Sequence, residues 1–196
     1  MKILISAFAL LFCLNMNAQK QTFDIASFIT PKGWKKQSTE SAVQFTKEDA
    51  TKGTYCMITL MKAIPGTSNS KENFDVAWET VVKEMVTVSA APEMQAPSKE
   101  DGWEAQSGYA PFQNEDNKGI ALLVTTSGYQ KMVNILILTN TDACEKEITA
   151  FLESVSFHKQ QQAQKETKQT TPAPVAVAAK GFTFSTTNFD DGWTAT

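Results

Sequence analysis

The chain has 196 residues, 42% of them hydrophobic and 20% charged, and a formal net charge of -3. All 18 of its basic residues are lysines, so it lacks both a basic field and the guanidinium forks with which proteins hold nucleic-acid phosphates. A single histidine, His158, excludes metal sites that need two imidazoles, such as the HExxH zinc helix. We therefore expect no nucleic-acid partner, no metal site and no cofactor.

The first eighteen residues, 1–18, have the pattern of a secretory signal peptide. Lys2 precedes an apolar run at 3–14, and a short polar stretch follows at 15–18. The run is shorter than the about 20 residues that a membrane-spanning helix needs, so we expect no permanent membrane span. Bulky Phe12 before Cys13 argues against a lipoprotein, which needs a small residue there. The sequence predicts a periplasmic or secreted protein in an oxidising compartment.

Composition divides the remainder into three parts. Residues 20–158 mix apolar periodic runs with turn residues and form the predicted globular domain. Residues 159–180 contain no aromatic residue and include a Pro-Ala segment, which is typical of a disordered linker. Residues 181–196 are aromatic again but too short to bury their rings alone. We expect the start of a second domain there, and the alternative is a tail that folds back onto the first domain.

Two strands and a long helix are expected in the first half of the domain. Val43 and Phe45 alternate with polar residues, and the strand at 54–63 is apolar on both faces, which indicates cover on both sides. Asn69 and Glu72 have the spacing of a capping box at a helix start. The helix has one apolar stripe formed by Phe74, Ala77, Trp78, Val81, Met85 and Val88.

Two hairpins and a second helix are expected in the second half. Strands at 93–97 and 103–109 flank the turn-like residues 98–102. Strands at 120–126 and 132–139, joined by residues 127–130, are strongly apolar and should form the centre of the sheet. Residues 140–142 should cap the last helix, whose apolar side must lie on the sheet. That side consists of Cys144, Ile148, Phe151, Leu152 and Val155.

This order of elements predicts an α+β domain, a three-layer α/β/α sandwich with a mainly antiparallel sheet. Together with the segments Phe23–Ile25, Pro31–Trp34 and Leu152–Phe157, it resembles the PsbP/Mog-type α/β/α sandwich superfamily, which includes DUF1795-like exported bacterial proteins. The resemblance covers about Phe23 to Phe157. It implies an antiparallel sheet with helices on both faces, in proteins known mostly as binding or assembly-support factors. The superfamily has no shared catalytic motif that could be carried over to this chain.

Residues that could carry catalysis are few. His158 stands where the domain gives way to the linker, and we interpret it as a surface residue. A Ser-His nucleophile would have to use this histidine, and the chain has no Gly-x-Ser-x-Gly elbow. The carboxylate pairs at 48–49, 100–101 and 115–116 fall in predicted turns, where solvated charge is the usual state.

The candidate binding residues are Tyr109, Phe112, Glu115 and Asp116, where aromatic rings run into an acidic loop. Aromatic side chains beside polar loop residues suit partner contacts. Burial of both rings in an ordinary core is the favoured alternative.

Cys56 and Cys144 remain after removal of the signal peptide, one on a strand face and the other on the apolar side of the last helix. They could form a disulfide if their Cα atoms approach within about 7 Å. Because the position of the strand in the sheet is open, the sequence favours two separate buried thiols.

The sequence as a whole favours an exported, non-enzymatic binding or assembly-support module of the bacterial cell envelope, with a protein or envelope component as partner. The alternative is a carboxylate-based hydrolase whose site is completed by a further C-terminal domain.

Overall fold

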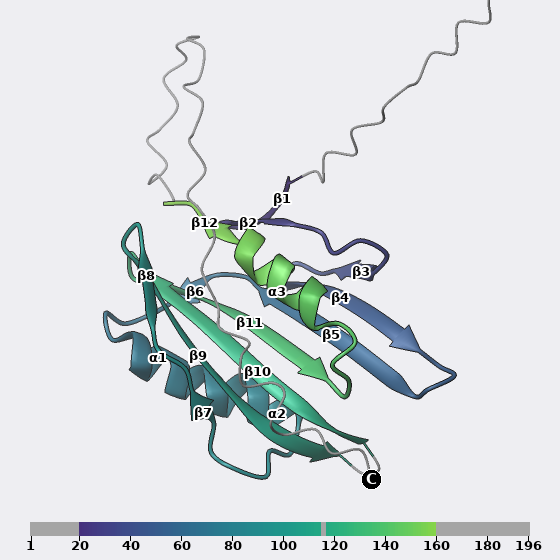
Figure 1. The fold of residues 1–196 in the computed structure, drawn as a ribbon. Helices are drawn as coiled ribbons and strands as arrows, with labels where there is room; N and C mark the ends of the chain where they lie inside the picture. The colour runs from purple at the N-terminus through teal and green to yellow at the C-terminus, as the bar shows by residue number, and fades with distance from the viewer. Residues whose placement is uncertain (1–19, 115–116, 160–196) are drawn as a thin grey trace, which may run out of the picture.

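The structure is a computed structural model that describes residues 20–114 and 117–159 (Figure 1). The predicted signal peptide, residues 160–180 of the predicted linker, the segment 181–196, and the candidate residues Glu115 and Asp116 lie outside the described residues.

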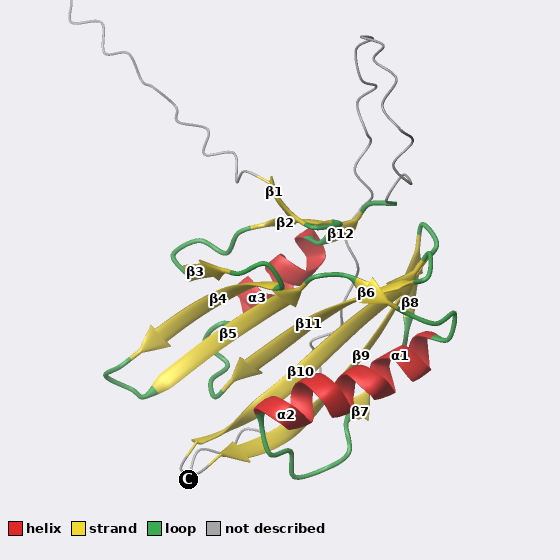
Figure 2. Ribbon diagram, turned by 180° about the vertical axis from the view of Figure 1, so that it is seen from behind, coloured by secondary structure: helices red, strands yellow, loops and turns green. Residues whose placement is uncertain are grey.

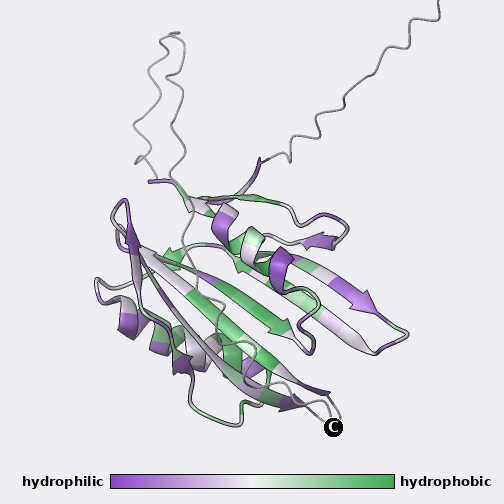
Figure 3. Ribbon diagram, viewed as in Figure 1, coloured by the Kyte–Doolittle hydropathy of each residue, from purple (hydrophilic) through white to green (hydrophobic). Residues whose placement is uncertain are grey.

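A large antiparallel sheet dominates the described part of the chain. Its strand order is β3-β4-β5-β11-β10-β9-β7, and β6 pairs with β11 while β8 pairs with β9. These strands are β3 (Lys35–Ser38), β4 (Ala42–Asp49), β5 (Thr54–Met61), β6 (Ile64–Pro65), β7 (Glu93–Met94), β8 (Ser98–Glu100), β9 (Trp103–Asn114), β10 (Asn117–Gly128) and β11 (Lys131–Thr139). The predicted hairpin of β10 and β11 is present, and both strands lie in the middle of the sheet as expected. The hairpin expected before it differs: residues 98–100 of the expected turn form β8, which pairs with β9, and only Glu93–Met94 of the strand expected at 93–97 pairs with β9 as a strand. Figure 3 shows apolar residues concentrated along these two strands.

The two faces of the sheet are covered differently. One face carries α3 (Glu145–Ser154) and a small antiparallel sheet of β1 (Lys20–Phe23), β2 (Ala26–Ile29) and β12 (Ser156–Phe157), in the order β1-β2-β12 (Figure 1). The other face carries one continuous helix made of α1 (Ser70–Ala77), the π-helical segment η1 (Trp78–Val82) and α2 (Lys83–Met85), seen from behind in Figure 2.

The predicted three-layer α/β/α sandwich is therefore wrong. Strands make up 51% of the described residues and helices 19%, with only two helices, so the protein is mostly antiparallel β. The segments that flank the domain, at 20–29 and 156–157, pair with each other and take up much of the layer in which helices were expected. Their pairing joins two segments more than a hundred residues apart in the chain, which no local periodicity reveals.

Each face of the sheet has its own apolar core. On the α3 side, the rings of Phe28, Phe45 and Phe151 lie 5.6 to 5.7 Å apart and join the small sheet, the large sheet and the helix. On the other side Phe74 and Trp78 stack at 5.7 Å. Gly108 of β9 faces this helix, and a Cβ there would come within 2.9 Å of the Phe74 ring, so the glycine permits close helix packing.

The first helix has the predicted position and start, but its buried face is shifted by one residue. Asn69 caps it by accepting a hydrogen bond from the Glu72 N–H at 3.2 Å. In η1 the Lys83 N–H donates to the Trp78 carbonyl, five residues back. This wider turn inserts one residue, so Val82 is buried where the 3.6-residue period predicted Val81.

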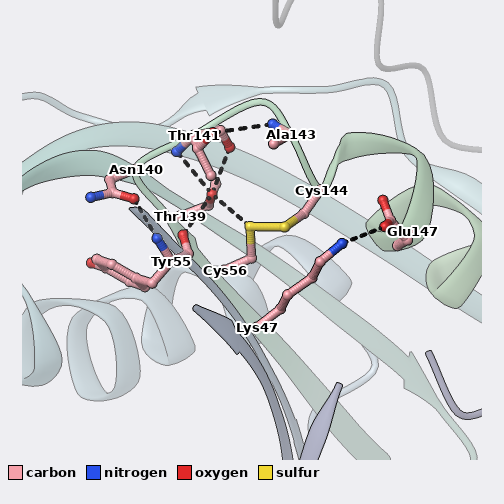
Figure 4. The surroundings of a disulfide bond; sticks show 9 residues. All are labelled: Lys47, Tyr55, Cys56, Thr139, Asn140, Thr141, Ala143, Cys144 and Glu147. Carbon is pink, nitrogen blue, oxygen red and sulfur yellow. Dashed lines mark hydrogen bonds and ion pairs between the residues drawn. A yellow bond between two sulfur atoms is a disulfide. The ribbon is translucent and has the colours of Figure 1, made fainter. Parts of the chain in front are cut away.

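The second helix is fastened to the sheet by a disulfide between Cys56 of β5 and Cys144, the residue before α3 (Figure 4). Their Cα atoms are 6.5 Å apart. The expectation of two separate buried thiols is therefore wrong. An ion pair between Lys47 and Glu147, 2.8 Å long, lies beside the bridge. The helix begins later than expected, since its N-cap is Cys144 and not a residue of 140–142.

Candidate functional site

The predicted binding residues do not form one surface. Phe112 is 3% exposed and belongs to the core under the first helix, where a Cβ at Gly119 of the paired strand would lie 2.8 Å from its ring. Tyr109, three residues earlier in β9, points to the opposite face and is partly buried on the α3 side. Side chains an odd number of positions apart in a strand point to opposite faces. Phe112 is therefore a core residue and not a contact residue.

Among the described residues, the carboxylates that the sequence singled out, at 48–49 and 100–101, do not converge on a catalytic pair. Glu48 and Asp49 end β4, whereas Asp101 lies in the β8–β9 turn at the other end of the sheet (Figure 1). A hydrogen bond from the Thr51 hydroxyl lowers the pKa of Asp49. Hydrogen bonding to Ser70 and then to Lys99 lowers the pKa of Glu104, and hydrogen bonding to Lys47 lowers that of Glu147. A general acid at neutral pH needs a carboxyl group whose pKa is raised, whereas the pKa values of these three groups are lowered.

His158 is exposed, as predicted, but it is also held in place. Its Nε2 lies 2.6 Å from the hydroxyl of Ser27 in β2, and its backbone N–H donates to the carbonyl of Ile25 at 2.9 Å. Ser27 also lies 3.2 Å from the Thr22 hydroxyl. Among residues 20–114 and 117–159, no carboxylate contacts the other ring nitrogen, so the third member of a catalytic triad is missing there. We interpret the pair as a link between β2 and the end of β12.

Strained backbone gathers at one end of the molecule. Within the described residues, the non-glycine residues with positive φ are Asp24 (51°), Asp101 (50°), Tyr129 (51°) and Gln130 (60°). They belong to the turns β1–β2, β8–β9 and β10–β11, which lie together at the top of Figures 1 and 2. We call these three turns, together with residues 63–66 and 158–159, the turn rim. Such strain persists only where the surrounding structure enforces it, and it often marks functional sites.

Hydrogen bonds join the parts of the turn rim. The Ala63 N–H donates to the Asp24 carboxylate at 2.9 Å. The Gly66 N–H donates to the Gln130 carbonyl at 3.1 Å. The Tyr129 hydroxyl donates to the Asp101 carbonyl at 2.7 Å. Segments distant in sequence are thus fixed against one another, and the rim presents a defined surface.

Tyr129 is the most prominent side chain of the turn rim. It and Gln130 form a two-residue turn with both φ values positive, a geometry that usually selects Asn-Gly. Its side chain is held by the hydrogen bond to Asp101 and by Trp103, whose ring lies edge-on at 5.4 Å. A Cβ on Gly102 would lie 2.9 Å from the tyrosine ring, so a glycine is needed beneath it. Even so, Tyr129 is 48% exposed.

Cationic and apolar groups surround this tyrosine. The Lys159 ammonium lies 4.9 Å from the centre of its ring, and hydrogen bonding to the Tyr129 side chain raises the pKa of Lys159. Ile64 of β6 is another exposed apolar residue of the rim, at 45%. Beneath the surface Trp103 contacts Phe157 at 5.4 Å and connects the rim to the core. The arrangement suits recognition of a partner by a rigid aromatic side chain.

Sequence reasoning placed Tyr129 in a hairpin loop and did not select it as a binding residue. The available signal was an aromatic side chain in a tight turn where glycine and asparagine are usual. Its neighbours Asp101 and Trp103 come from the β8–β9 turn and Lys159 from the segment after β12, so its surroundings could not be foreseen.

No helix in the described ranges is long and apolar enough to cross a membrane. The same ranges contain no group of three or more His, Cys, Asp or Glu residues placed to hold a metal ion. The chain matches no protein-family model, and the search of curated proteins finds no relative.

Proposed function

We propose that this chain is an exported, non-enzymatic binding or assembly-support module of the bacterial cell envelope, and that it contacts a protein or envelope component through the turn rim. The observation that carries the proposal is Tyr129, which is half exposed and yet fixed by a hydrogen bond, a ring contact and a strained backbone.

The cost of this turn supports a role in binding. A left-handed conformation costs a non-glycine residue about 1 to 2 kcal/mol, and Tyr129 and Gln130 both adopt it. Asn-Gly would form the same turn without that cost. A tyrosine whose position is already fixed loses little conformational entropy when a partner covers it, which is why tyrosine is common at binding hot spots.

Export to an oxidising compartment is supported by two features of the chain. The first eighteen residues have the signal-peptide pattern, and the domain contains the Cys56–Cys144 disulfide.

The test is the substitution Tyr129→Asn. Asparagine tolerates the left-handed conformation, so relief of strain should offset the lost contact with Trp103, and the melting temperature should change by only a few degrees. Partner capture from a cell-envelope extract, measured by quantitative mass spectrometry, should fall at least tenfold for the proteins enriched by the wild-type chain.

The matched control is Val76→Asn, because Val76 is 49% exposed but belongs to α1 and not to the turn rim. This variant should capture the same proteins as the wild type. Equal capture by Tyr129→Asn and wild type would rule out the rim as the contact surface, and so would an equal loss in both variants.

A further inference from the structure

The two faces of the small sheet differ in chemistry. Phe28 of β2 packs in the core of the α3 side (Figure 1). Because side chains alternate along a strand, Ser27 points the opposite way, to the outward face of the small sheet. The strand register places Thr22 of β1 and Ser156 of β12 directly opposite Ser27, and residues so paired share a face. Three hydroxyl side chains therefore lie in one row across the three strands.

Lys20 and His158 complete a cluster around this row. The Lys20 ammonium, from β1, donates to the Ser156 hydroxyl at 2.7 Å, so its side chain reaches across β2 to the third strand. The Nε2 atom of His158 lies 2.6 Å from the Ser27 hydroxyl. That hydroxyl lies 3.2 Å from the hydroxyl of Thr22. We call these five residues the small-sheet cluster.

The small-sheet cluster joins fixed groups to accessible ones. Ser27 is 4% exposed and Ser156 5%, so the strands hold both hydroxyls in defined positions. Lys20, Thr22 and His158 are exposed. A ligand from solvent can therefore reach the Lys20 ammonium, and a group bound to this ammonium stands beside the Ser156 hydroxyl. Sites for small ligands commonly have a few polar groups positioned in this way.

Donors outnumber acceptors in the small-sheet cluster. The ammonium carries three hydrogens, each hydroxyl carries one, and the imidazole carries at least one. In the described parts of the chain, the hydrogen bonds of these five side chains go to one another, and no carboxylate or carbonyl accepts from them. Two hydrogens of Lys20 and the hydroxyl hydrogen of Ser156 are left over. Because buried polar groups are normally paired, the cluster calls for an acceptor from outside.

The small-sheet cluster also carries a positive charge without a matching negative one. Among residues 20–30 and 156–159 the single carboxylate is that of Asp24. It accepts a hydrogen bond from the Ala63 N–H at 2.9 Å, and Ala63 lies beyond the end of β5, so this carboxylate is directed away from the cluster. The acceptor that fits the Lys20 ammonium is therefore an anion.

A phosphate group has the properties that the small-sheet cluster lacks. It carries negative charge and three strong acceptor oxygens that point in different directions. A carboxylate offers two oxygens in one plane and matches fewer of the free donors. Lysine binds phosphate as a point charge, without the bidentate geometry of arginine. The lack of arginine argues against binding along a nucleic-acid backbone, but a single phosphate group needs no extended basic field.

We propose that the small-sheet cluster binds a single phosphate group, with Lys20 and Ser156 as its direct contacts and the imidazole of His158 beside it. The phosphate belongs to a soluble compound or to a lipid headgroup, two sources of the same chemistry. His158 also belongs to the turn rim, but the contacts of Tyr129 do not enter the cluster. This inference is therefore independent of the proposed function.

The first test uses His158 as a reporter, because it is the one histidine of the chain. The full mature chain is labelled with ¹⁵N-histidine and purified without a histidine tag, so its NMR spectrum contains the ring nitrogens of one residue. Inorganic phosphate, added at constant pH and ionic strength, should shift these signals until the site is saturated. Acetate under the same conditions should have little effect. An equal response to acetate would overturn the assignment to phosphate.

The substitution Lys20→Gln removes the charge that pairs with the phosphate. It should raise the dissociation constant about tenfold or more, and Ser156→Ala should raise it about threefold or more. Because Lys20 is exposed, Lys20→Gln should leave the fold intact.

The matched control is Lys36→Gln. Lys36 also lies beside the small sheet, but it donates to Gln21 at 2.6 Å, and alternation places Gln21 on the face opposite to Thr22. This variant should bind phosphate like the wild type. An equal loss in Lys20→Gln and Lys36→Gln would show a general effect of charge and would overturn the proposal.

Vesicles separate the two sources of the phosphate group. The chain is sedimented with phosphatidylcholine vesicles that contain phosphatidic acid, and with phosphatidylcholine vesicles alone. Sedimentation that requires both phosphatidic acid and Lys20 would assign the site to a lipid headgroup. A response to inorganic phosphate without sedimentation would assign it to a soluble compound. If neither inorganic phosphate nor phosphatidic acid binds, the small-sheet cluster is not a phosphate site.

Discussion

Cys56 in the sheet and Cys144 at the start of α3 are joined by a disulfide although 88 positions separate them in the sequence. The bond closes a loop that contains β6, the first helix, both long hairpin strands β10 and β11, and β9. It fixes α3 above β5, so the core formed by Phe28, Phe45 and Phe151 is enclosed by a covalent link as well as by packing.

Removal of the disulfide should destabilise the fold without preventing its formation. The double substitution Cys56→Ala/Cys144→Ala should lower the free energy of unfolding by about 2 to 4 kcal/mol, because the unfolded chain regains the entropy of the open loop. Urea unfolding of both proteins, with and without reductant, measures this difference, and the double variant should not respond to reductant. Alkylation of both cysteines in native exported protein would show that the bond does not form.

The π-helical turn predicts which of two neighbouring valines supports the core. Val82 is completely buried, whereas Val81 is partly exposed. Val82→Ala should lower the free energy of unfolding by about 2 to 3 kcal/mol through lost apolar burial and a cavity, and Val81→Ala should cost clearly less. A regular α-helix through these residues would reverse the order, so equal or reversed effects in chemical denaturation would contradict the shifted face.

Phe112 should behave as a core residue. Phe112→Ala should cost about 3 to 5 kcal/mol of unfolding free energy, because its ring fills the space beside Gly119 and under the first helix. The control is Gln113→Ala, since this neighbour is exposed and its loss should change stability by no more than about 0.5 kcal/mol. A Phe112→Ala protein that melts like the wild type would return this residue to the candidate binding surface.

Glu104 should make stability depend on pH in the acidic range. Hydrogen bonding to Ser70 and Lys99 holds its pKa in the folded state below the ordinary value of 4.5. Its contribution to stability is therefore complete above the unfolded pKa and is lost as pH falls through the lower folded pKa. In urea unfolding at pH 7 the free energy of unfolding should be larger for the wild type than for Glu104→Gln. This difference should shrink towards pH 3. Glu84→Gln, an exposed change on α2, serves as the control, and a Glu104 difference that does not vary with pH would contradict this origin.

Much of the local structure could be predicted from the sequence because it depends on neighbouring residues. Asn69 and Glu72 marked the start of the first helix through a hydrogen bond between residues three apart. The apolar runs of β10 and β11 and the short turn between them predicted the central hairpin, since hairpin pairing is set by adjacent segments. The apolar side of α3 followed from its helical period, and Ile148, Phe151 and Leu152 are buried as expected.

Other features were decided only by tertiary structure, because they depend on residues far apart in the chain. The small sheet pairs β2 with β12, and this pairing replaced the expected layer of helices. Cys56 and Cys144 are also far apart in the chain, so the sequence alone did not show that they form a disulfide. Tyr129 became a candidate binding residue only when Asp101, Trp103 and Lys159 were seen around it. Local preferences act over one turn of helix or one hairpin, whereas the free energy of these contacts comes from surfaces that meet only after the sheet has formed.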